Sequence, residues 1–113
     1  MNNLKRLLVI TILFFGSISF GQDNEGVGKV NGSFCLTLQG ENDVKDIYIV
    51  DATSLNWTSQ KEADKACGYH SNNLVSYRAN FEENKLIVRI HTDRTGEKKD
   101  LNWWNEYLAS ICQ

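Results

Sequence analysis

The sequence predicts an α+β domain in which two helices pack on one face of a four-stranded, antiparallel-type sheet, with the element order ββαββα. Two observations support this fold class. Four short runs alternate apolar and polar residues with the period of a half-buried strand. Two other segments begin with helix-capping residues and continue with apolar residues at helical spacing.

The first two strands are predicted on either side of a turn. In residues 34–38 the apolar Phe34, Leu36 and Leu38 alternate with two other residues, as in a strand with one buried face. Gly40–Asp43 provides turn residues, and Lys45–Ala52 is the most β-prone run of the chain. We expect Lys45–Ala52 to be the central strand and the first strand to form a hairpin with it.

The first helix is predicted to begin at a capping box. Ser59 is followed three residues later by Glu62, so the hydroxyl can accept a hydrogen bond from the amide of Glu62. The helix is expected to end near Cys67, because Gly68 follows it.

A hairpin and a second helix complete the predicted domain. Residues 75–81 and 86–90 alternate, and a turn centred on Glu83-Asn84 places Phe81 opposite Leu86. The same register places Arg78 opposite Arg89. Asp100 then caps a helix that continues to Ile111. Its apolar stripe consists of Leu101, Trp104, Leu108 and Ile111.

This element order resembles a ferredoxin-like sandwich in which the usual last strand has moved to the front of the chain. The resemblance covers residues 33–112, depends on the order of the elements and carries no sequence motif. It implies two helices on one face and an uncovered sheet face on the other.

The amino terminus has the layout of a cleavable export signal. Lys5 and Arg6 precede the apolar run Leu7–Phe15, and the small residues of Gly16–Gly21 follow it. The apolar run is shorter than the roughly 20 residues of a membrane span. We therefore expect a cleaved signal at residues 1–21, a flexible tether at residues 22–32 and a single domain at residues 33–113. The mature chain would be secreted or periplasmic and would not span a membrane.

The charge of the chain excludes general polyanion binding. Loss of Lys5 and Arg6 with the signal leaves 10 basic residues of the original 12 against 14 acidic residues, a net charge of −4. A domain that binds nucleic acid through its phosphates needs a positive field. Nucleic acid is therefore not an expected partner.

Three cysteines remain after signal cleavage, and in an oxidising compartment they favour one disulfide and one free thiol. The predicted topology brings Cys35 and Cys112 to the same end of the sheet and leaves Cys67 free. The strand pattern argues against this pairing, because alternation directs the Cys35 side chain to the face opposite that of Phe34 and Leu36. The absence of a disulfide and a different pairing stay open as alternatives.

Cys67 also belongs to the alternative functions. Cys67 and His70 have a Cys-x-x-His spacing, and with His91 they give a hypothetical copper or zinc site. A thiol enzyme that uses Cys67 would need an orienting group and an oxyanion site, and no motif indicates either. We expect no catalytic residues and no cofactor.

The uncovered sheet face is the predicted binding site. If Ile47 and Ile49 face the helices, then Tyr48, Arg78, Arg89 and His91 share the other face with Val50 and Ile87. Trp103, with Tyr107 one turn later, adds an exposed aromatic ridge. The chain is therefore interpreted as a binding module for a protein, a peptide or an acidic glycan. The sequence leaves monomer and homodimer open.

Overall fold

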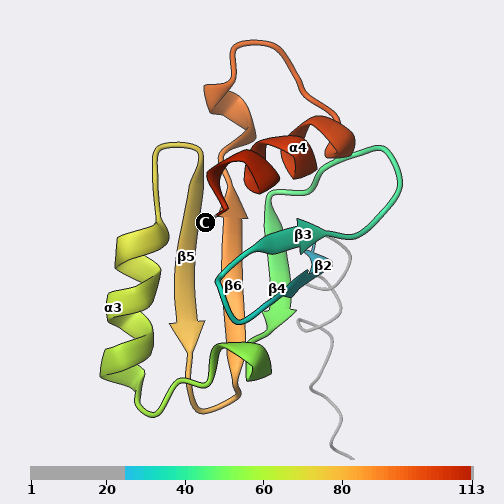
Figure 1. Cartoon of the computed structure of the whole chain (residues 1–113). Helices are drawn as coiled ribbons and strands as arrows, with labels where there is room; N and C mark the ends of the chain where they lie inside the picture. Colours follow the sequence, from blue (N-terminus) through green and yellow to red (C-terminus); the bar gives the residue numbers. More distant parts are fainter. Residues whose placement is uncertain (1–24, 113) are drawn as a thin grey trace, which may run out of the picture.

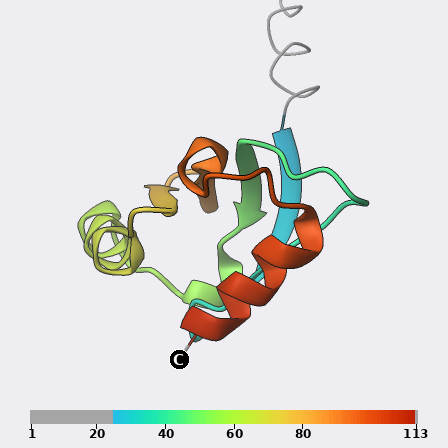
Figure 2. The ribbon, with the colours of Figure 1, turned by 90° about the horizontal axis from the view of Figure 1, so that it is seen from above.

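In the computed structural model, which describes residues 25–112, two helices cover one side of a five-stranded, curled, mixed sheet (Figure 1). The view from above shows α4 crossing the sheet and α3 lying beside β5 (Figure 2). The strand order is β3-β2-β4-β6-β5. The elements are β2 (Glu25–Val30), β3 (Leu36–Leu38), β4 (Ile47–Asp51), α3 (Gln60–His70), β5 (Val75–Asn80), β6 (Lys85–Ile90) and α4 (Leu101–Ile111), with 3₁₀ turns at Thr53–Leu55 and Thr92–Arg94.

The predicted α+β class is confirmed, but the predicted four-stranded sheet is wrong. Residues 25–30, expected within a flexible tether, form β2, which lies between β3 and β4. The predicted first strand pairs with β2 and not with the central strand. Because the β2–β3 hairpin reverses the chain once more, β2 runs parallel to β4. The ferredoxin-like resemblance is therefore matched only loosely. The signal predicted at residues 1–21 lies outside the described residues.

The inward face of β4 is the reverse of the predicted one. Tyr48 and Val50 are each 1% exposed and face the helices, whereas Ile47 and Ile49 are half-buried on the other face. The register explains the reversal, because Gly26 pairs with Tyr48 across the parallel strands. A methyl group at Gly26 would overlap the Tyr48 ring. Glycine on β2 thus provides the space into which the tyrosine packs.

The β5–β6 hairpin is confirmed, but its register differs by two residues from the predicted one. Asn80 pairs with Lys85, and residues 81–84 form the turn. Asn84 adopts a left-handed conformation there (φ 58°), which asparagine tolerates. Arg78 consequently lies opposite Ile87 and not opposite Arg89.

Both predicted helix caps are present. The amide of Glu62 donates to Ser59 Oγ (3.0 Å), and the amide of Trp103 donates to Asp100 Oδ1 (2.9 Å). The first helix continues through Gly68 to His70, contrary to prediction. Ser71 ends it, since its hydroxyl and its amide both donate to the Cys67 carbonyl.

The core fills the space between the sheet and the helices. Its largest fully buried side chains are Trp104, Tyr48, Leu86, Ile90, Val50, Val75 and Val88. No helix among residues 25–112 is long and apolar enough to cross a membrane.

The predicted disulfide between Cys35 and Cys112 is confirmed and links β3 to the end of α4, with the two Cα atoms 5.2 Å apart. Phe34 explains how Cys35 reaches its partner. Phe34 has a left-handed backbone (φ 64°), and both Phe34 and Cys35 precede β3, so the regular strand geometry that would direct Cys35 away from the helices does not extend to them; Cys35 is half-buried.

Polar side chains of the helices close both edges of the sheet. At the β3 edge, Asn105 of α4 accepts a hydrogen bond from the Leu38 amide (2.8 Å) and donates one to the Leu38 carbonyl (3.0 Å). The side chain thus occupies backbone groups that a further strand would use.

The β5 edge is closed from both ends of α3. Gln60 donates to the Ala79 carbonyl (3.0 Å) and accepts from the Phe81 amide (3.0 Å). Ser71 accepts from the Tyr77 amide (2.9 Å). These contacts protect the edge against strand addition.

Candidate binding face

The face of the sheet that points away from the helices carries an aliphatic stripe. Val27 of β2 pairs with Ile49 of β4, and Ile49 pairs with Ile87 of β6. Ile47 precedes Ile49 on the same face. Val27 is 58% exposed, and the three isoleucines are half-buried. We call these four residues the open-face stripe.

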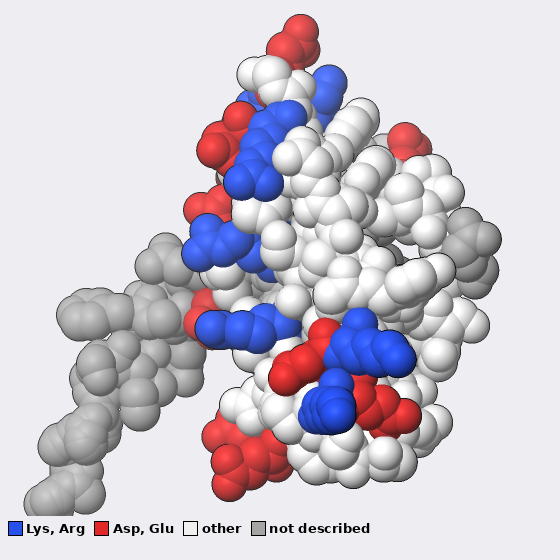
Figure 3. Space-filling model, turned by 90° about the vertical axis from the view of Figure 1, so that its left-hand side faces the viewer, with Lys and Arg blue, Asp and Glu red and all other residues white. Residues whose placement is uncertain are grey.

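Two exposed arginines border the open-face stripe. Arg78 pairs with Ile87, and Arg89 pairs with Ile47 on one side and with Ser76 on the other. The arginines are therefore diagonal neighbours, within reach of one another's long side chains. Viewed from the α3 and β5 side, Lys and Arg side chains gather along the margin that faces away from α4, with acidic side chains among them (Figure 3).

A hollow lies between these arginines. It has a volume of about 370 Å³ and is lined by Ile47, Ser76, Tyr77, Arg78, Ile87 and Arg89. A second hollow, of about 470 Å³, shares Ile47 and Arg89 with the first and adds Val44, Lys45 and Asp46. The face thus presents an apolar floor whose walls carry three cationic side chains, Lys45, Arg78 and Arg89, and one carboxylate, Asp46, which suits an anionic group attached to an apolar body.

His91 lies at the end of this face. Its Nε2 is 2.7 Å from Ser76 Oγ. Desolvation is the largest of the effects that lower the pKa of His91. The positive charges of Arg94 and Arg89 lower it further, and the negative charge of Asp93 partly opposes them. His91 is therefore mainly neutral near pH 7 and serves as a hydrogen-bonding group.

The structure brings Arg78, Arg89 and His91 to one face, but not Tyr48. The Tyr48 ring is buried in the core, where its oxygen accepts a hydrogen bond from the Lys45 amide (2.9 Å). Burial raises the pKa of Tyr48. The sequence interpretation missed Val27, Ile47 and Ile49, because the first falls in the supposed tether and the others were assigned to the helix-facing side.

Trp103 belongs to a different surface. It is half-buried on α4 and stacks parallel to Tyr107, with the ring centres 5.8 Å apart. The Lys99 ammonium lies 5.4 Å from the centre of the Trp103 ring. Trp103 and Tyr107 therefore stack as neighbours, but both are half-buried against the core and do not form the predicted exposed ridge, and the helix places them away from the arginines.

The residues of the metal and thiol alternatives are not assembled. Among residues 25–112, no three His, Cys, Asp or Glu side chains form a group that could hold a metal ion, so Cys67, His70 and His91 make no such site. Cys67 is 3% exposed, and burial, together with nearby Asp64, raises the pKa of its thiol to about 11. A thiol with this pKa is a poor nucleophile near neutral pH.

Comparisons of the chain with models of known protein families, with curated proteins and with solved structures return no match and assign neither a family nor a function.

Proposed function

We propose that the protein is a secreted or periplasmic binding module whose open sheet face recognises an acidic peptide segment. One observation carries this proposal: the open-face stripe continues across three strands and is bordered by Arg78 and Arg89. Apolar side chains of the segment would cover the stripe, and its carboxylates would pair with the two guanidinium groups.

The closed edges favour recognition through side chains. Strand addition, the other common way to bind an extended peptide, uses free backbone groups at a sheet edge. Here Asn105 hydrogen-bonds to the backbone amide and carbonyl of Leu38. Gln60 and Ser71 hydrogen-bond to backbone groups of β5 and of the turn that follows it. A peptide is therefore expected to lie on the face of the sheet.

The composition of the face favours a peptide over an acidic glycan. With Tyr48 in the core, Tyr77 is the one aromatic residue among the described residues that line the two hollows, and its ring packs edge-on against buried Phe34, so it is not free to stack on a sugar ring. Aliphatic side chains provide the floor instead. Nucleic acid is disfavoured by the net charge of −4 that signal cleavage would leave.

Export is part of the proposal. The Cys35–Cys112 disulfide is of the kind that persists in oxidising compartments. Signal cleavage after Gly21 would make the chain 21 residues shorter than its gene product, and the intact mass of the exported protein measures this directly.

A labelled peptide of alternating Glu and Val tests the binding proposal. Fluorescence anisotropy should show saturable binding that weakens with added salt, because exposed ion pairs are screened. Arg78→Glu with Arg89→Glu should abolish this binding and leave the circular dichroism spectrum unchanged.

The matched control reverses two charges on another surface, with Lys61→Glu and Lys65→Glu on the exposed side of α3. This variant should bind the peptide as the parent does. Equal binding by the arginine variant, or equal binding of a Lys-Val peptide, would refute the proposal. Sedimentation of the free protein as a dimer that the arginine variant disrupts would instead identify a second copy as the occupant.

A further inference from the structure

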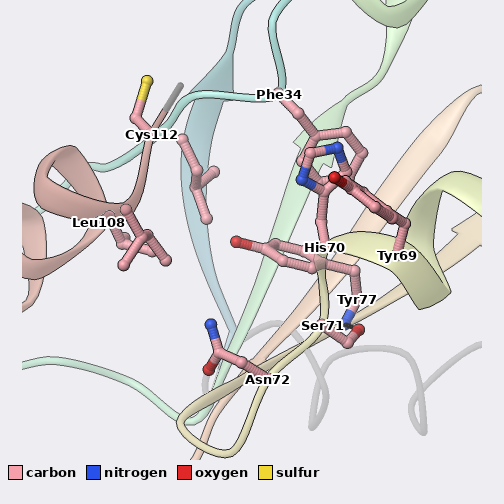
Figure 4. Close-up of a pocket in the computed structure, with 10 residues that line it drawn as sticks. Phe34, Tyr69, His70, Ser71, Asn72, Tyr77, Leu108 and Cys112 are labelled. Carbon is pink, nitrogen blue, oxygen red and sulfur yellow. Dashed lines mark hydrogen bonds between the residues drawn. The ribbon is translucent and has the colours of Figure 1, made fainter.

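Another cavity lies on the opposite side of the sheet, where the carboxyl ends of α3 and α4 approach β3 and β5. Its volume is about 290 Å³, comparable with a small ligand-binding pocket. It is lined by Phe34, Leu36, Tyr69, His70, Ser71, Asn72, Tyr77, Leu108, Ile111 and Cys112 (Figure 4). We call it the inter-helix pocket.

Two hydrogen-bond donors are directed into the inter-helix pocket. Figure 4 shows the Tyr77 hydroxyl pointing into it, with the Asn72 amide nitrogen turned toward the same space. The orientation of the Asn72 amide is fixed, because its oxygen accepts from the amides of Leu74 (2.8 Å) and Val75 (3.0 Å). Within the described residues, neither Asn72 Nδ2 nor the Tyr77 hydroxyl has a hydrogen-bond partner.

Aromatic side chains form one wall. Phe34 stacks on His70 with the ring centres 4.1 Å apart and meets Tyr77 edge-on at 5.0 Å. Tyr69 is 84% exposed at the rim. Phe34 adopts its left-handed backbone at the end of the β2–β3 turn, where its amide donates to the Asn31 carbonyl (3.1 Å), and this turn places its ring in the wall.

The pocket is lined by uncharged residues, and its electrostatic potential is slightly negative. None of its lining residues is Asp, Glu, Lys or Arg. Burial lowers the pKa of His70, so its imidazole is mainly neutral near pH 7. The carboxyl ends of both helices add partial negative charge, which disfavours anions.

We propose that the inter-helix pocket binds a neutral, ring-containing compound that carries a carbonyl group. The carbonyl oxygen accepts hydrogen bonds from Tyr77 and Asn72. The ring packs against Phe34, Leu36 and Leu108. Tyr77 lines both this pocket and the hollow between the arginines, but the two sites take ligands of opposite preference, since the arginines select an anion and the pocket rejects one.

The disulfide holds the two sides of the pocket together. Cys112 lines it, and its bond to Cys35 fixes the end of α4 beside Phe34 and Leu36. Reduction should therefore weaken ligand binding.

Benzamide and benzoate are the probes, because they share a ring and differ in charge. Methyl NMR of isoleucine provides the readout, since Ile111 lines the pocket whereas Ile90 is buried in the core. Benzamide should shift the Ile111 signal saturably, and benzoate should not. Tyr77→Phe, which keeps the ring and removes the donor, should weaken benzamide binding about fivefold to tenfold.

Tyr48→Phe is the matched control, because the Tyr48 hydroxyl accepts from the Lys45 amide outside the pocket, and its loss should leave benzamide affinity unchanged. Arg78→Glu with Arg89→Glu should also leave the affinity for benzamide unchanged, so a failure of one proposal can be distinguished from a failure of the other. Absence of an Ile111 shift, an equal response to benzoate, or an equal loss with Tyr48→Phe would overturn the proposal.

Discussion

The two faces of the sheet are made from alternate residues of the same strands, yet their surroundings differ. On the covered face, Tyr48 and Val50 lie beneath the helices with almost no exposed surface. On the open face, Ile47 and Ile49 stay half-exposed beside arginines. The edges, where backbone groups would otherwise be free, are closed by helix side chains. The comparison indicates that the fold suppresses backbone pairing and leaves one surface for recognition by side chains.

Neighbouring substitutions in β4 should separate the two faces most strongly. Tyr48→Ala removes a fully buried ring and should lower the free energy of unfolding by about 3–5 kcal/mol. Ile49→Ala, one residue later, should cost about 1 kcal/mol because the side chain is already half-exposed. Urea unfolding followed by circular dichroism measures both. A larger loss for Ile49→Ala would show that the assigned faces are reversed.

Much of the fold follows from the sequence, but the orientation of this central strand does not. Ile47 and Ile49 are as apolar as Tyr48 and Val50, so alternation within β4 favours neither face. The deciding partner is Gly26, whose missing side chain admits the Tyr48 ring. Two glycines in residues 25–30 also lower the local β propensity, so the sequence predicts a tether where the structure has a strand.

The caps, the hairpin and the α+β class depend on local signals and were predictable. The register of the hairpin was not, because a four-residue turn closed by left-handed Asn84 competes with a two-residue turn of similar composition. The pairing of Cys35 depended on the backbone of Phe34, which alternation cannot reveal. The alternation of side chains along the strands predicts that Arg78 and Arg89 share one face of the sheet. The inter-helix pocket could not be predicted, because it depends on the extension of α3 to His70.

The edge closure predicts a moderate effect on stability and association. Asn105→Ala leaves two backbone groups of Leu38 without their partner and should cost about 1–3 kcal/mol. Asn102→Ala, on the exposed side of the same helix, should change stability by less than about 0.5 kcal/mol. Sedimentation velocity should show concentration-dependent association only for Asn105→Ala. A variant that stays monomeric would show that this cap does not limit edge pairing.

The smallest effect concerns pH. The pKa values of His70 and His91 lie below the ordinary value of 6.5, mainly through desolvation, so the unfolded chain binds protons more readily than the folded chain. The two histidines do not affect stability well above pH 6.5. The free energy of unfolding should decrease as the pH falls below 6.5 toward the pKa values of the histidines in the folded chain. Asp51 and Glu62, whose pKa values are also lowered, lose their stabilising effect only in the more acidic range below their ordinary values of 3.8 and 4.5.

Chemical denaturation at a series of pH values measures this dependence. His70→Gln with His91→Gln should remove the decline near pH 6 and keep the acidic one. An unchanged profile in the double variant would assign the decline to other groups.

Isoleucine methyl NMR with the alternating Glu-Val peptide tests the central claim most directly. The described residues contain two buried or pocket reporters, Ile90 and Ile111, and three open-face reporters, Ile47, Ile49 and Ile87. The account predicts saturable shifts of the three open-face signals, with Ile90 and Ile111 unchanged. Binding that leaves those three signals unmoved while the amides of β3 or β5 shift would contradict it, because the peptide would then occupy an edge.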